Sequence, residues 1–115
     1  MSRDPHRYLD DVIEAGSAIL AYTASFDYER FSQDLKTIDA VIRRFEIIGE
    51  AVKRLPAEWT ESEPQIPWSA IKGFRDVLAH AYFQVDEEIV WSTIEKDLKP
   101  LLAACRRLQE VQSGK

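Results

Sequence analysis

The sequence predicts an all-α protein, an up-and-down bundle of four helices with or without one additional short helix. Three observations lead to this prediction. The 115 residues contain only four glycines and five prolines, whereas residues that favour helices are abundant. Apolar residues recur at spacings of three and four, and no segment shows the strict alternation of a strand. The predicted helices are joined by short connections, which is typical of antiparallel neighbours.

The first helix is expected over residues 4–23. Asp4 and Pro5 form a typical helix start, because the aspartate side chain caps free amide groups and proline fits the first helical position. The residues that follow repeat apolar side chains on one helical face. A short polar break is expected at residues 24–27.

The second helix is expected to be long and to end at Leu55, because Pro56 disfavours a helical conformation in the residue before it. An interruption is expected near Lys36 and Thr37. Gly49 either lets another helix approach closely or is tolerated at a cost of about 1 kcal/mol against alanine. The apolar seam of this helix alternates spacings of four and three and consists of Phe31, Leu35, Ile38, Ile42, Phe45, Gly49 and Val52.

The longest loop is expected at residues 57–67, which are rich in proline and acidic residues. Trp59 and Ile66 are expected to attach this loop to the body of the protein through their large apolar side chains. A third helix is expected to begin at Trp68 or the proline before it and to reach about Tyr82.

The last helix is expected to begin after Asp86, which is a suitable cap, and Glu87 and Glu88 match the positive end of the helix dipole. Pro100 is expected to kink this helix, and the tail from Gln112 is expected to fray. The predicted apolar stripe consists of Ile89, Val90, Ile94, Leu98, Leu101, Leu102, Cys105 and Leu108.

The length indicates one domain over residues 1–115, small enough to gain from forming a homodimer. Cys105 is the single cysteine, which excludes an internal disulfide and suits a reducing compartment. The N-terminus lacks the apolar region of a signal peptide, and no apolar run approaches the roughly 20 residues of a membrane span. A cytoplasmic protein without membrane contact is therefore expected. The net charge of −5 argues against a passive nucleic-acid coat protein.

Several kinds of site are missing from the sequence. It contains no glycine-rich phosphate loop, no nucleophile elbow and no metal-binding spacing of cysteine and histidine. His6 and His80 are the only histidines and lie far apart, and His6 is expected to be exposed. The chemistry is therefore expected to be metal-free acid–base catalysis or binding alone.

The residues that can carry chemistry gather in the run FRDVLAHAYF, where Arg75, His80 and Tyr82 form the pattern R-x4-H-x-Y. Imidazole has an unperturbed pKa of about 6.5 and is the natural general acid–base. A guanidinium is a permanently charged fork that suits a phosphate. Asp76 precedes His80 by four residues and so shares its helical face, where it could fix one imidazole tautomer or favour the protonated form.

On one regular helix Arg75 and His80 point about 140° apart, at roughly 100° per residue. Either the helix is distorted near His80, or two copies meet and build a composite site, and the second arrangement also gives the small domain its dimer partner. The plainer interpretation is that these side chains serve as surface, cap or packing residues. Arg43–Arg44 and Lys53–Arg54 are either solvated charges or a basic rim for RNA or an acidic partner.

The sequence resembles the HepT-like branch of the HEPN superfamily, small all-α proteins marked by an R-x4-6-H motif. The resemblance rests on RDVLAHAY with Arg75, His80 and Tyr82, preceded by IPWSAIKGF. It extends to KTIDAVIRRFEIIGEAVKRL at residues 36–55 and VDEEIVWSTIEKDLKPL at residues 85–101, and it covers nearly the whole chain in the same order.

This resemblance implies a metal-independent endoribonuclease, a homodimer in which two motifs face one cleft. His80 would act as acid–base on the 2′-hydroxyl or the leaving oxygen, and Arg75 would hold the scissile phosphate of an RNA substrate. Asp76 stands where such proteins often have asparagine, and its extra negative charge could lower activity.

The same resemblance implies the toxin half of a type VII-like toxin–antitoxin pair. Its partner would be a minimal nucleotidyltransferase of the MntA type, which uses ATP and Mg²⁺ to transfer AMP to Tyr82. RNA cleavage itself would need no cofactor. Two rival hypotheses remain: a non-catalytic nucleotide- or substrate-binding subunit of a nucleotidyltransferase complex, and a structural dimer whose motif only packs.

Overall fold

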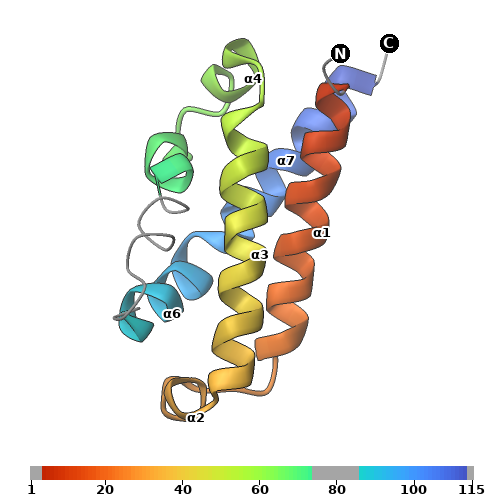
Figure 1. Ribbon diagram of the computed structural model, residues 1–115. Coiled ribbons are helices and arrows are strands. Elements are labelled where there is room, and N and C mark those ends of the chain that lie inside the picture. The colour runs from red at the N-terminus through yellow and green to blue at the C-terminus, as the bar shows by residue number, and fades with distance from the viewer. Residues whose placement is uncertain (1–3, 74–85, 114–115) are drawn as a thin grey trace.

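The structure, a computed structural model, describes residues 4–73 and 86–113. Within these ranges all regular structure is helical and no strand occurs (Figure 1). This confirms the predicted all-α class. Among the helices in these two ranges, none has the length and hydrophobicity needed to cross a bilayer.

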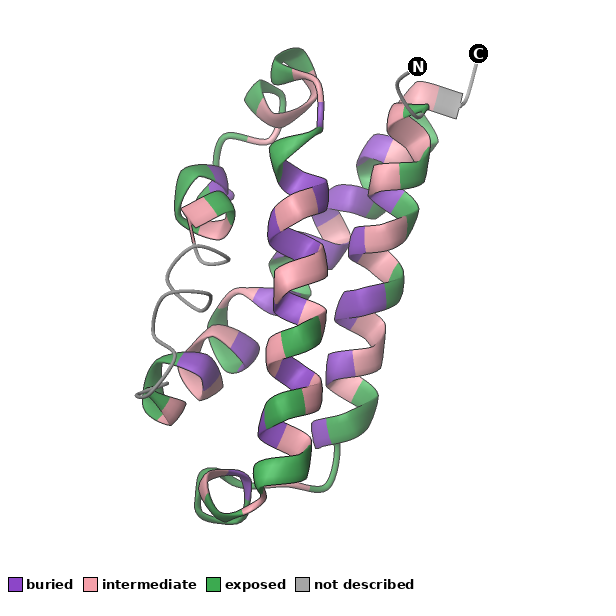
Figure 2. Cartoon of the chain, in the orientation of Figure 1, coloured by how far each residue is buried: buried purple, intermediate pink, exposed green. Residues whose placement is uncertain are grey.

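Two long helices form the centre of the molecule (Figure 1). Helix α1 (Pro5–Thr23) runs antiparallel to α3 (Leu35–Lys53), and α7 (Leu98–Ser113) packs against α1. The short helix α2 (Tyr28–Gln33) contacts both α3 and α6 (Glu87–Lys96). Figure 2 shows buried residues in purple along the sides of these helices that face one another.

Aspartates begin α1, α2, α3 and α6, as predicted for α1 and α6. The Asp4 carboxylate accepts a hydrogen bond from the amide of His6 at 2.9 Å, and Asp86 accepts from the amide of Glu88 at 3.0 Å. Each carboxylate satisfies an amide that has no partner within its own helix. The caps therefore fix the helix starts from local sequence alone.

The interruption predicted in the second helix occurs at Asp34, which divides this segment into α2 and α3. The Asp34 carboxylate accepts a hydrogen bond from the amide of Thr37 at 3.0 Å, so this residue caps a new helix. The interruption thus precedes the expected position near Lys36 and Thr37. Leu35, predicted on the apolar seam, is 72% exposed at the first position of α3. The helix is interrupted here because the Asp34 side chain competes with the helical backbone for hydrogen bonds.

The expected loop at 57–67 begins with a short helix, α4 (Ala57–Glu61), which is a second difference from the prediction. This helix starts directly after Pro56, whose φ of −58° suits the residue before a helix. Ile66 is buried, as expected, and Trp59 is half-buried against the core. Residues 68–73 are helical, which confirms the predicted start of the third helix, whereas its predicted end at Tyr82 lies outside the described residues.

The predicted last helix is also divided, into α6 and α7, with the break at Asp97. Pro100 was predicted to kink one helix, but it separates two helices instead. A proline clashes with the carbonyl four residues earlier, here that of Lys96, so the first helix ends there and Pro100 lies in the first turn of the next. Ile89 is 54% exposed, which contradicts its predicted place on the apolar stripe, while the other predicted members of the stripe are buried.

Close approach of two helices occurs at Gly16, which the sequence analysis did not single out. A Cβ atom added to Gly16 of α1 would lie 2.5 Å from Cδ2 of Leu102 in α7, and Leu102 is itself buried. Gly49 is buried on α3. A side chain at position 16 would therefore force the buried Leu102 side chain to move.

Gly16→Ala is expected to destabilise the protein by about 1–3 kcal/mol, because the added methyl group overpacks the contact with Leu102. Gly73→Ala is the matched control. No neighbouring atom lies within 4 Å of a Cβ at Gly73, and residues 71–73 are helical, so alanine there is expected to add up to about 1 kcal/mol. Urea denaturation of both variants measures the two changes. Equal effects of the same sign would contradict the steric explanation.

Candidate functional site

The four residues predicted to carry chemistry, Arg75, Asp76, His80 and Tyr82, lie outside the described residues. The structure therefore leaves their predicted roles untested. It does describe both ends of the stretch that contains them. Those ends are residues 62–73 on one side and the start of α6 at Asp86 on the other.

A compact turn between α4 and residue 68 leads into this stretch. The amide of Ile66 donates to the carbonyl of Glu63 at 3.2 Å, and the indole Nε1 of Trp68 donates to the same carbonyl at 2.9 Å. Ile66 and Trp68 are both buried. Two large apolar side chains and one shared carbonyl thus anchor the turn.

The side chain of Glu63 ties this turn to α7. Its Oε1 accepts from Nη2 of Arg107 at 2.7 Å and from Nε2 of Gln65 at 2.7 Å, and its Oε2 accepts from Nε of Arg107 at 3.1 Å. A forked arginine–carboxylate pair of this kind is stronger and more directional than a single hydrogen bond. The Glu63 side chain is only 13% exposed, while that of Arg107 is 49% exposed.

Hydrogen bonds from Arg107, and then from Gln65, lower the pKa of Glu63 below its ordinary value of 4.5. The stabilisation from this lowered pKa is therefore present above pH 4.5 and is lost as the pH falls through the lowered value. Burial, and then the nearby charge of Glu63, raises the pKa of the Cys105 thiol to about 12. Cys105 is completely buried on α7, so the predicted core position is confirmed.

The sequence analysis did not identify Glu63 and Arg107. They are separated by 44 positions, and each belongs to a segment rich in charged residues. Local spacing gives no signal for such a pair. Only the packing of the turn against α7 brings the two side chains together.

The other end of the stretch is fixed by α6. Phe31 of α2 packs against Trp91 of α6 with ring centroids 5.1 Å apart, and Phe31 is completely buried. Partial desolvation, and then the negative charges of Glu88, Glu87 and Asp86, raise the pKa of Tyr28. The surface at the start of α6 is thus acidic, which does not attract a nucleic-acid backbone.

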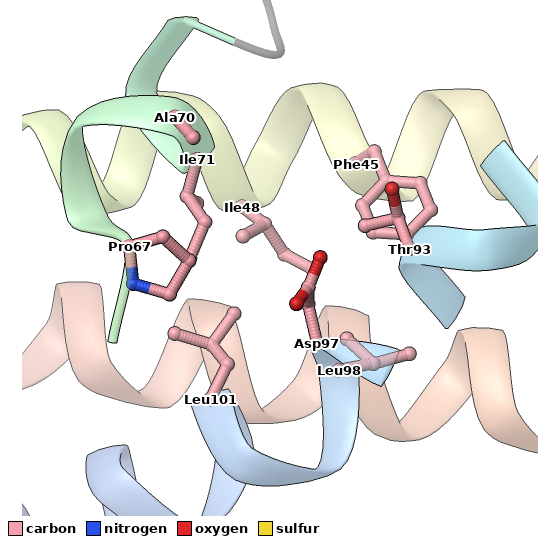
Figure 3. Close-up of a pocket in the computed structure, with 9 residues that line it drawn as sticks. All are labelled: Phe45, Ile48, Pro67, Ala70, Ile71, Thr93, Asp97, Leu98 and Leu101. Atoms are coloured by element: carbon pink, nitrogen blue, oxygen red, sulfur yellow. The ribbon is translucent and has the colours of Figure 1, made fainter. Parts of the chain in front are cut away.

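A small cavity lies between α3, the segment 68–73, α6 and α7 (Figure 3). Its volume is about 70 Å³, well below the several hundred Å³ that a small-molecule site occupies. The cavity lies beside the segment that leads to the motif and is too small for a nucleotide. Its walls are formed by Phe45, Ile48, Pro67, Ala70, Ile71, Thr93, Asp97, Leu98 and Leu101.

The arginines predicted as either solvated charges or a basic rim are mostly neutralised. Arg54 forms an ion pair with Glu50 at 2.9 Å, and Arg43 lies 3.7 Å from Glu46. A groove of about 510 Å³ between α1 and α3 is lined by Asp11, Glu46, Glu50 and Arg43 among other residues, so carboxylates outnumber guanidinium groups there. This arrangement favours solvated charges and argues against an RNA-binding rim on α3.

His6 is not fully exposed, contrary to the prediction. Its Nδ1 lies 2.8 Å from Oδ1 of Asp4, and its ring packs edge-on against Trp59 with centroids 5.3 Å apart. The side chain is 41% exposed. His6 thus joins the start of α1 to α4, which is a structural role.

Within residues 4–73 and 86–113, no group of three or more histidine, cysteine, aspartate or glutamate residues is arranged to hold a metal ion. The described part of the chain therefore supplies a scaffold and two fixed ends for the motif-bearing stretch. It contains no alternative catalytic constellation of the metal-dependent kind.

Comparison with known proteins identifies consistent relatives. A family model described as "Ribonuclease HepT-like" matches residues 12–108. A protein of Thermococcus cleftensis named "Probable ribonuclease HepT" is 40% identical over 110 residues, which cover 96% of this chain and 100% of that protein.

Two further relatives carry RNase in their names. One, from Methanocaldococcus jannaschii, is 39% identical over 92 residues, or 80% of this chain and 76% of its own length. The other, from Caldanaerobacter subterraneus subsp. tengcongensis, is 37% identical over 99 residues, or 86% of this chain and 88% of its own length. No solved structure matches the fold significantly.

Proposed function

The chain belongs to the ribonuclease HepT-like family, and from this premise we propose that it is a metal-independent endoribonuclease that uses Arg75, Asp76 and His80. One observation carries the proposal. The family match extends over residues 12–108 and so includes the R-x4-H-x-Y motif of this chain. The motif supplies an acid–base group and a phosphate-binding group.

His80 acts as the acid–base of the reaction in this proposal. It removes the proton of the RNA 2′-hydroxyl, whose oxygen attacks the adjacent phosphorus, or it protonates the 5′-oxygen that leaves. Arg75 binds the phosphate oxygens and stabilises the charge that develops on them. Asp76 holds the imidazole of His80 in one orientation.

Two copies of the chain are proposed to form the working unit. Arg75 and His80 diverge by about 140° on a regular helix, so one helix does not direct both at a single phosphate. Two motifs that face each other in a homodimer remove this conflict. RNA contacts are then confined to the dimer cleft, which fits the net charge of −5 and the carboxylate-rich groove between α1 and α3.

Tyr82 is proposed as the point of regulation in a type VII-like toxin–antitoxin pair. A minimal nucleotidyltransferase partner of the MntA type would bind ATP and Mg²⁺. The phenolic oxygen of Tyr82 attacks the α-phosphorus of ATP, a new P–O bond forms, pyrophosphate leaves, and the phenolic proton passes to a base or to water. The AMP group adds bulk and negative charge two residues from His80, where the RNA phosphate must bind.

The test is intact-mass spectrometry of the chain expressed alone and with such a nucleotidyltransferase, paired with an RNA cleavage assay on both samples. We expect the co-expressed protein to gain whole AMP units at Tyr82 and to lose cleavage. Tyr82→Phe, co-expressed in the same way, is expected to remain unmodified at this position and to keep cleaving RNA. A substrate with one 2′-deoxynucleotide at the scissile position is expected to resist cleavage.

The outcomes separate the proposals. If the chain cleaves RNA but gains no AMP on co-expression, the ribonuclease proposal stands and the proposed regulation at Tyr82 is rejected. If RNA stays intact in every sample while the nucleotidyltransferase co-purifies, the chain is instead a binding subunit of that enzyme.

A further inference from the structure

The contacts of Glu63 form a polar network that joins distant segments of the described part of the chain. We call the group Glu63, Gln65, Trp68 and Arg107 the Glu63 clamp. The Glu63 carboxylate accepts two hydrogen bonds from Arg107 and one from Gln65. The Glu63 carbonyl accepts a hydrogen bond from the Trp68 indole at 2.9 Å. The clamp thus connects α7 to the turn from which the helical segment 68–73 begins.

The apolar packing around segment 68–73 is incomplete on one side. Ala70 and Ile71 line one wall of the 70 Å³ cavity, and Ile71 is only half-buried. A side chain beside an empty volume loses the contacts that would otherwise fix it. The apolar contacts of segment 68–73 therefore run through the buried Trp68 and through Ala70 and Ile71 at the edge of this cavity.

The Glu63 clamp holds segment 68–73 in one orientation relative to α7. A guanidinium and a carboxylate that share two hydrogen bonds are held in one plane, so the pair restricts rotation as well as distance. The carbonyl of the same residue fixes the Trp68 ring, at the first position of the helical segment. The orientation of α7 is in this way transmitted to the chain that leads to Arg75.

We propose that Glu63 and Arg107 are positioning residues for RNA cleavage. They set the direction in which the chain enters residues 74–85 and hence the placement of the catalytic motif. This inference rests on the proposed function. Neither residue touches the substrate, and both act through the turn and segment 68–73.

The test uses the full chain with six single variants and one double variant. Glu63→Gln keeps the shape of the side chain and removes its charge, while Arg107→Lys keeps the charge and removes the fork. Glu61→Gln and Arg106→Gln are the matched controls, since both residues are exposed and lie within two positions of the clamp residues. The double variant exchanges the partners as Glu63→Arg with Arg107→Glu.

Cleavage of a defined RNA is measured as kcat and KM at a temperature where thermal denaturation shows each variant to be fully folded. We expect Glu63→Gln and Arg107→Lys to lower kcat by about 10- to 100-fold, the range that a misplacement of about 1 Å can cause. KM is expected to change much less, and both controls are expected to match the unmodified chain. The exchanged pair is expected to recover more kcat than either Glu63→Arg or Arg107→Glu alone.

A purely structural role predicts another pattern, in which Tm falls while kcat of the folded protein stays at the control value. That result would overturn the positioning role and leave the proposed function intact. Failure of the proposed function is recognised separately, because the unmodified chain would then cleave no RNA or His80→Ala would cleave it equally well.

Discussion

His80→Ala is expected to reduce RNA cleavage by about 10²- to 10⁴-fold, the usual contribution of one positioned general acid–base. The imidazole is the group in the motif that can both take up and release a proton near neutral pH. Single-turnover cleavage of a labelled RNA measures the effect. Thermal denaturation of the same sample establishes that the variant is folded.

His6→Ala is the matched control, because His6 is the other histidine of the chain, packs against Trp59 and has no role in the proposed chemistry. Its cleavage rate is expected to equal that of the unmodified chain. Equal cleavage by both histidine variants would remove His80 from the mechanism. Loss of cleavage in the His6 variant alone would indicate that the start of α1, and not His80, contributes the catalytic group.

Phe31→Ala is expected to lower the free energy of unfolding by about 3–5 kcal/mol. Phe31 is completely buried and packs against Trp91, so its removal opens a cavity where α2 meets α6. Leu35→Ala is the contrasting variant. Leu35 is 72% exposed, and its truncation is expected to change stability by no more than about 0.5 kcal/mol.

This pair of variants distinguishes two descriptions of residues 28–53. A continuous helix with one apolar seam predicts similar losses at both positions. The division at Asp34 predicts a large loss at Phe31 and almost none at Leu35. Urea denaturation decides between them, and equal losses would contradict the division.

The division of helices has a common origin. Asp34 and Asp97 each stand at a helix junction, and in both places a polar or proline-containing sequence competes with the helical backbone. The apolar pattern continues across each junction, so periodicity predicts one helix where two exist. The capping Asp34 marks the first boundary and Pro100 marks the second, whereas the apolar pattern marks neither.

Local sequence patterns were sufficient to predict the helical class, the capped starts at Asp4 and Asp86, and most of the core. These features depend on residues three or four positions apart, and that spacing can be read directly. The motif at Arg75, His80 and Tyr82 is also visible in the sequence. The family match at residues 12–108 confirms the family resemblance.

Only the tertiary structure decided which helices approach most closely and how the turn before the motif is held. The contact of Gly16 with Leu102 joins residues 86 positions apart, and the pair of Glu63 with Arg107 joins residues 44 apart. Leu35 and Ile89, both predicted to lie on apolar faces, are 72% and 54% exposed in the folded chain. The physical reason is that such contacts form between side chains whose separation depends on packing of whole helices, and helical periodicity contains no information about that distance.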